Sequence, residues 1–180
     1  MCGQPAPEQQ LPARFIAVCH PGSDVVRDHV LGIPTAIRQE HEEIHARLAL
    51  ATKLAGRTGE AARALAEVLH PHFVREEQIA LPPLGLLAGL AKGEPVAGML
   101  EVLPMVDALR AELPHMIEEH RAITAATRRL AGAAELEGQA AAAQLAAELL
   151  AHAGMEEQVM YPAAVLVGEL VRLRAASASG

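Results

Sequence analysis

Two stretches of this sequence resemble each other closely enough to decide how the chain folds. Residues 65–82 read LAEVLHPHFVREEQIALP, and residues 145–162 read LAAELLAHAGMEEQVMYP. At this offset of 80 residues, leucine, histidine, glutamate, glutamine and proline recur at the same places. At an offset of 79, a shorter match relates Glu40, His41 and Ile44 to Glu119, His120 and Ile123. This repetition predicts that the chain is built from two similar helical hairpins.

The composition favours helices over sheets. Of the 180 residues, 51% are hydrophobic but only 2% are aromatic, with one Tyr, two Phe and no Trp. The core must therefore be filled by Leu, Val, Ile, Met and Ala, which suit closely packed helices and are poorly matched to strands. The length fits a single domain with a substantial core.

Proline and glycine divide the chain into four long helical segments. The helices are expected over residues 35–55, 59–80, 105–131 and 138–161, with a kink at Pro114 in the third, a stop at Pro162 and a short helical tail. Gly56 is expected to stop the first helix. Four long helices with short connections predict an all-α fold, an antiparallel up-and-down four-helix bundle over residues 34–176. Residues 1–33 are expected to form a leader with one short helix over residues 24–31.

Helical geometry predicts that the repeated histidines point into the bundle. At about 100° per residue, Glu156 lies about 40° and Leu149 about 60° from His152, so the pair shares the apolar face. The segment around His72 and Glu76 has the same spacing, and His41 and His120 share faces with apolar residues. By the same reckoning Val159 points inward, and Tyr161, about 180° from His152, is expected to pack under the end of the helix without touching metal.

This set of inward-facing residues is unusual for a core. One buried histidine with a hydrogen-bond partner is common, but buried carboxylates without partners cost several kcal/mol. Metal coordination removes that cost, because glutamate stays charged and imidazole nitrogens become ligands. Imidazole and carboxylate without thiolate suit iron, manganese or zinc, and six ligands exceed the need of one zinc. The sequence therefore predicts two metals that share carboxylates, held by His41, His72, Glu76, His120, His152 and Glu156.

The same residues resemble the hemerythrin-like, HHE cation-binding, protein family. The likeness rests on His41, His72-xxx-Glu76, His120 and His152-xxx-Glu156, with a proline six residues after each glutamate, and it covers about residues 35–165. It implies a four-helix bundle with a non-heme centre of two iron ions, bridged by an oxo or hydroxo group. It also implies that the six residues are the ligands, with Glu76 and Glu156 bridging. Where invertebrate hemerythrin has an HxxxH pair on its third helix, this chain has it on the first, as His41 and His45.

Other patterns offer competing interpretations. His41-Glu42-Glu43-Ile44-His45 also reads HExxH, the helix of zinc hydrolases, but the second half has no copy of it. His45 lies about 40° from His41, so it is either a seventh ligand, a support for one, or exposed. Glu77 and Glu157, about 140° from their histidines, are expected to be solvated or to support the ligands. Two Glu-xx-His pairs mimic ferritin motifs and are expected at the surface, Glu67 with His70 and Glu112 with His115.

The predicted centre favours a small ligand. Four histidines, two bridging carboxylates and an oxo or hydroxo bridge leave about one open coordination position on each iron. If His45 also binds, about one open position is left in the whole centre. The first hypothesis is a carrier, sensor or iron-handling protein that binds dioxygen, nitric oxide or iron itself. The second is an enzyme that reduces nitric oxide or decomposes peroxide at the same centre. The third is a helical interaction protein whose histidines are incidental.

Charge and segment composition exclude several partners. With 15 Lys and Arg against 22 Asp and Glu, the net charge is −7, which disfavours nucleic acid and anionic membranes. No apolar run approaches the ~20 residues of a membrane span, and residues 1–10 lack the features of a signal peptide. Two cysteines, Cys2 and Cys19, are too few for a disulfide framework. These observations favour a cytoplasmic location.

Overall fold

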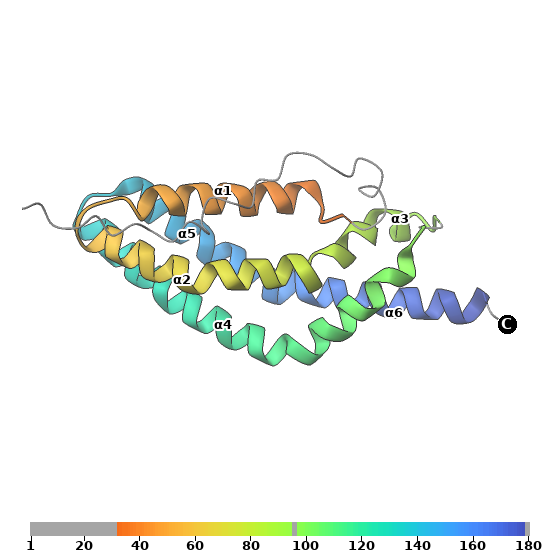
Figure 1. The fold of residues 1–180 in the computed structure, drawn as a ribbon. Helices are drawn as coiled ribbons and strands as arrows, with labels where there is room; N and C mark the ends of the chain where they lie inside the picture. Colours follow the sequence, from red (N-terminus) through yellow and green to blue (C-terminus); the bar gives the residue numbers. More distant parts are fainter. Residues whose placement is uncertain (1–31, 95–96, 179–180) are drawn as a thin grey trace, which may run out of the picture.

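The computed structural model describes residues 32–94 and 97–178, and every regular element within these ranges is helical (Figure 1). The predicted short helix over residues 24–31 lies outside the described residues. The prediction of an all-helical fold is confirmed. The long helices are α1 (Thr35–Ala51), α2 (Gly56–Ile79), α4 (Leu103–Leu136), α5 (Ala140–Met155) and α6 (Tyr161–Ala178). The shorter elements are η2 (Pro82–Leu86), α3 (Leu87–Ala91), η3 (Met99–Val102) and the π-helical turn η4 (Glu156–Met160).

Four of the helices enclose a common interior. Helix α1 contacts α2 and α5, and α4 contacts the same two helices from the other side, so the four form a closed ring (Figure 1). All four contribute to one apolar cluster, with Leu48, Leu69, Leu130 and Leu145 among its fully buried members. Burial of these side chains is the main source of stability for helices of this kind.

A second apolar cluster lies beyond the first, toward the end of the ring where α6 begins. It contains Leu81, Leu109, Met116 and Tyr161, and Ile37 packs against it. Along α1, α2 and α4, and along α5 with the π turn that follows it, the repeated histidine lies between a residue of one cluster and a residue of the other. The histidines therefore form a polar layer between two apolar ones.

Helix α1 ends four residues earlier than predicted, and Gly56 has a different role. The Thr52 hydroxyl donates a hydrogen bond to the Ala49 carbonyl, and the next two amides bond to carbonyls three residues back, which closes the helix. Gly56 instead opens α2, with φ of +76°. The positive φ favours glycine, and a Cβ at this position would lie 2.6 Å from the Glu137 carboxylate and displace it.

Glu137 explains why that approach is needed. Its carboxylate accepts hydrogen bonds from the Arg57 and Thr58 amides and from the Thr58 hydroxyl. These are amide groups of the first turn of α2 that no helix carbonyl can satisfy. The C-terminus of α4 thus caps the N-terminus of α2, and the pKa of Glu137 is lowered by these hydrogen bonds.

The prolines interrupt the helices less than predicted. Helix α4 continues through Pro114 and changes direction along its course, in keeping with the predicted kink (Figure 1). Pro162 does not stop the fourth long segment, which continues through the π turn into α6. The Tyr161 amide bonds to the Glu156 carbonyl, five residues back, and Pro162 follows in the first turn of α6, where its missing N–H costs least.

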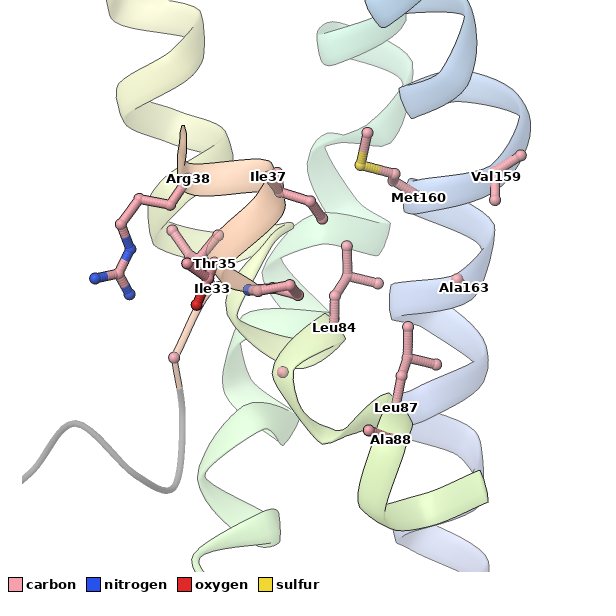
Figure 2. A pocket seen from close by; sticks show the side chains of 13 residues that line it. Ile33, Thr35, Ile37, Arg38, Leu84, Leu87, Ala88, Val159, Met160 and Ala163 are labelled. Carbon is pink, nitrogen blue, oxygen red and sulfur yellow. The ribbon is translucent and has the colours of Figure 1, made fainter. Parts of the chain in front are cut away.

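A pocket opens beside this end of the molecule. It is lined mainly by apolar side chains from the start of α1, from η2 and α3, and from η4 and the start of α6, including Ile37, Leu84 and Met160. Arg38 is the charged residue at its rim (Figure 2). None of the six predicted ligands lines it. No helix within the described residues has the length and apolarity that a membrane crossing requires.

Candidate metal centre

The six predicted ligands converge in the interior of the helical ring. His41 comes from α1, His72 and Glu76 from α2, His120 from α4, His152 from α5, and Glu156 from the π turn. Each side chain is 3% exposed or less, although histidine and glutamate are seldom fully buried. The helical repeat of His-xxx-Glu places each histidine one turn before its glutamate, so both reach the same interior level.

Their ligand atoms form two groups that share one carboxylate. Nitrogen or oxygen atoms of His72, Glu76, His120 and Glu156 all lie within 4.8 Å of one another, and the same holds for His41, His152 and Glu156. We refer to these as the His72–His120 group and the His41–His152 group. Each group offers two imidazole nitrogens from helices that belong to different hairpins.

Each buried carboxylate directs one oxygen toward each group. Glu156 Oε1 lies 2.7 Å from His152 Nε2 and 3.6 Å from His41 Nε2, and its Oε2 lies 3.3 Å from His120 Nε2. Glu76 Oε1 lies 3.5 Å from His72 Nε2, and its Oε2 lies 3.9 Å from His41 Nε2. This is the arrangement that two bridging carboxylates require.

A second layer of carboxylates surrounds the histidines. Each Nδ1 faces a glutamate on a neighbouring element: His41 faces Glu77 at 3.3 Å, His72 faces Glu119 at 2.9 Å, His120 faces Glu157 at 2.8 Å, and His152 faces Glu40 at 3.1 Å. In the first three pairs the Nδ1–H donates a hydrogen bond, and the fourth is an ion pair without that alignment. A proton held on Nδ1 leaves the Nε2 lone pair free to face the centre.

The charges of the centre favour a cation. Burial alone lowers the pKa of His41 and His72, but their glutamate neighbours outweigh it and raise both pKa values to about 9. Burial opposes ionisation of Glu156, yet the adjacent imidazoles of His120, His152 and His41 hold its pKa well below the usual range. Burial and the charge of Glu156 raise the pKa of Glu76. Each shift shows that the site gains from added positive charge.

Unpaired atoms point to the same conclusion. Buried polar atoms without a hydrogen-bond partner include His41 Nε2, Glu76 Oε2, His152 Nε2 and Glu156 Oε1. All four belong to the groups described above, and such atoms are costly in a native interior. A cation among them would be bound by the nitrogen and oxygen donors that first-row metals take. The residues present therefore fit a metal centre.

The predicted direction of Tyr161 is wrong, and the π turn is the reason. A π turn inserts one extra residue, which rotates all later positions back by about 100°. Tyr161 then lies about 80° from His152 instead of about 180°, close to the direction of Glu156. Its hydroxyl donates to Glu76 Oε1 and lies 3.1 Å from His120 Nε2. Val159, predicted to point inward, is 52% exposed for the same reason.

The structure does not bring His45 into either group. Its ring is half-buried and lies edge-on to Phe73 at 5.1 Å and to His70 at 5.6 Å, which directs it toward α2. Burial lowers its pKa. Because His41 and His45 share no group, the HExxH interpretation has no geometric support.

The ferritin-like pairs do not converge on the centre. His115 is 72% exposed and pairs with Glu119, whereas Glu112 pairs with Arg75. Glu67 is exposed, and His70 is half-buried rather than at the surface as predicted.

Sequence reasoning missed two members of the outer carboxylate layer. Glu40 and Glu119 each precede a histidine, and their match across the repeat was the signal that could have found them. Glu77 and Glu157, which were expected to be solvated or supporting, are 40% and 38% exposed and contact His41 and His120.

Comparison with known families agrees with the geometry of the centre. The chain matches the Hemerythrin HHE cation binding domain over residues 33–164, which span both groups and all four helices of the ring. Comparisons with curated proteins and with solved structures gave no match. The match covers well over half of the chain and confirms the resemblance seen in the sequence. The chain therefore belongs to the hemerythrin HHE cation-binding family.

Proposed function

We propose that this protein is a non-heme di-iron protein that binds a small ligand, dioxygen or nitric oxide, or takes up iron itself. The observation that supports it best is the set of buried, unpaired nitrogen and oxygen atoms in two groups that share carboxylates. Two cations would pair with these atoms and remove the cost of leaving them unsatisfied. One cation would leave one group unpaired.

The two groups define the ligand sets. His72 and His120 would hold one iron, His41 and His152 the other, and Glu76 and Glu156 would bridge them. The absence of thiolate from the donor set and the mixture of imidazole with carboxylate favour iron over a structural zinc site. The helices α1, α2, α4 and α5, with their short α1–α2 and α4–α5 connections, would form an antiparallel up-and-down bundle over residues 34–176, after a leader of residues 1–33.

The protein residues would perform three tasks around the iron. When bound, iron supplies a redox-active Lewis acid with open positions for a diatomic molecule. The apolar clusters on both sides of the polar layer keep bulk water away from these positions. The outer glutamates hold the imidazoles in one tautomer, with Nδ1 protonated and Nε2 directed at the centre. The mainly apolar pocket beside Ile37, one turn before His41, would be the side from which a small uncharged ligand approaches (Figure 2).

The decisive experiment is metal analysis of the purified chain combined with an optical spectrum in air. About two irons per chain are expected for a centre of this type, and a single zinc or no stoichiometric metal would contradict the proposal. Steady-state consumption of peroxide or nitric oxide by the iron-loaded protein separates the two functional hypotheses. A binding protein takes up ligand once per centre, whereas an enzyme continues to consume it.

A further inference from the structure

The hydroxyl of Tyr161 lies among the ligand atoms of the His72–His120 group. The side chain is 1% exposed, and it is the single tyrosine of the chain. Its Oη bonds to Glu76 Oε1 and lies 3.1 Å from His120 Nε2 and 3.5 Å from His72 Nε2. Adjacent ligand atoms around a cation with bonds of about 2.1 Å lie about 3 Å apart. The spacing of Oη from the two nitrogens is therefore close to that between two ligands of one metal.

The Tyr161 hydroxyl has one proton and three polar neighbours. It donates this proton to Glu76, so it has none for the Nε2 atoms of His72 and His120. The Nδ1 atoms of both histidines face Glu119 and Glu157, which directs the two Nε2 atoms toward the same point as the hydroxyl. A cation at this point would contact the phenol oxygen, the two nitrogens and the carboxylate together.

Among the residues that the structure describes, the other group has no equivalent oxygen. Across the repeat, the counterpart of Tyr161 is Leu81, whose amide bonds to the Glu76 carbonyl five residues back, as the Tyr161 amide does to Glu156. Leu81 is fully buried and offers no donor atom. The aromatic neighbour of the His41–His152 group is Phe73, which stacks on His41 at 4.0 Å and also lacks a ligand atom. The backbone is repeated, but the phenol oxygen is present once.

We propose that Tyr161 is a direct oxygen ligand of the metal held by His72 and His120. The inference rests on the proposed di-iron function. Phenolate oxygen is a hard donor of the kind that ferric iron accepts in proteins. Coordination releases the hydroxyl proton, one H⁺ for each iron bound at this position. That iron has five protein donors and the other has four, so an added small ligand binds at the His41–His152 position.

The test is resonance Raman spectroscopy of the full-length protein, loaded with iron in air, with and without ring-deuterated tyrosine. A visible ferric–phenolate charge-transfer band is expected, and its enhanced ring modes shift on deuteration. Because the chain has one tyrosine, a shifted mode is assigned to Tyr161 without further labelling. This measurement needs no substitution, so it decides the question even if a variant fails to fold.

Substitution gives the complementary measurement. Tyr161→Phe is expected to abolish the band while iron stays near two per chain. Met160→Leu, a control of similar volume at the preceding position of the same cluster, keeps the band. Iron bound without a deuterium-sensitive band, or a band that survives in Tyr161→Phe, overturns the proposal while the di-iron function stands. A protein that binds no iron overturns both.

Discussion

The two metal-ligand groups come from one repeated pattern, yet they differ in how their atoms are satisfied. In the His72–His120 group, the Tyr161 hydroxyl contacts Glu76 and both imidazoles. In the His41–His152 group, the Nε2 atoms of both histidines approach Glu156 but make no aligned hydrogen bond, and the ring that stacks on His41 is that of Phe73. The two similar hairpins thus supply two similar sets of histidine and glutamate, and the Tyr161 side chain makes the two sets different. Symmetry of the ligands does not imply symmetry of reactivity.

The largest effect is expected where the two groups are joined. Glu156→Gln removes the carboxylate that both groups share and to which three histidines direct Nε2. Iron content is expected to fall from about two per chain to less than one, with a loss of about 3–5 kcal/mol in unfolding free energy because buried partners are left uncompensated. Metal analysis and denaturant unfolding measure these quantities. Glu148→Gln, an exposed control on the same helical segment, should change neither the iron content nor the fold.

Substitution of one histidine in each group compares the groups directly. His72→Ala and His152→Ala are each expected to lower the iron content by about half, since each removes a ligand from one group only. His70→Ala, two residues from His72 on another face of α2, should keep the full content. Equal loss from His70→Ala and His72→Ala would mean that the assignment of helix faces is wrong.

A smaller effect is expected from the outer carboxylates. Glu119→Gln weakens the hydrogen bond that holds the His72 imidazole in its tautomer, and such changes lower metal affinity about 10–100-fold. Competition with a chelator of known affinity measures the change. Glu118→Gln alters an exposed neighbour that pairs with Arg121, and it should leave affinity unchanged. Equal metal affinity in the two variants would show that the outer glutamates do not contribute to metal binding.

The smallest effect concerns pH in the metal-free protein. The pKa values of His41 and His72 are raised to about 9 by their glutamates, so the stability that these charged histidines contribute is complete below pH about 6.5 and is lost as pH rises through about 9. The melting temperature of chelated protein should therefore fall across this range. Bound metal should raise the melting temperature and reduce the fall. A melting temperature of chelated protein that is constant or rises from pH 6.5 to 9 would contradict the predicted role of these charges.

The comparison also shows which parts of the structure could be predicted from the sequence. Helical periodicity was sufficient to predict the inward direction of six side chains: His41, His72, Glu76, His120, His152 and Glu156. The first five lie within regular α-helices, and Glu156 is the first residue of the π turn, before the direction changes. It failed for Tyr161 and Val159, which lie within or after the π turn, where one extra residue changes the direction of every later side chain.

Errors at the helix ends have a related cause. The role of Gly56 depends on Glu137, which lies about 80 residues away in the sequence and caps α2. Local patterns carry no information on a contact of this kind. The outer carboxylate layer was partly visible in the sequence, since Glu40 and Glu119 match across the repeat. Their contacts with His152 and His72 were not predicted.

The contacts between the histidines and the outer glutamates determine how the centre can assemble, because some lie within one hairpin and others join the two. The His41–Glu77 and His120–Glu157 contacts lie within one hairpin each, whereas His72–Glu119 and His152–Glu40 join the two. A nascent chain that has folded only α1 and α2 holds His41 in place but leaves His72 without its outer glutamate, and it lacks Glu156 altogether. Tight capture of a cation must therefore wait until both hairpins have docked.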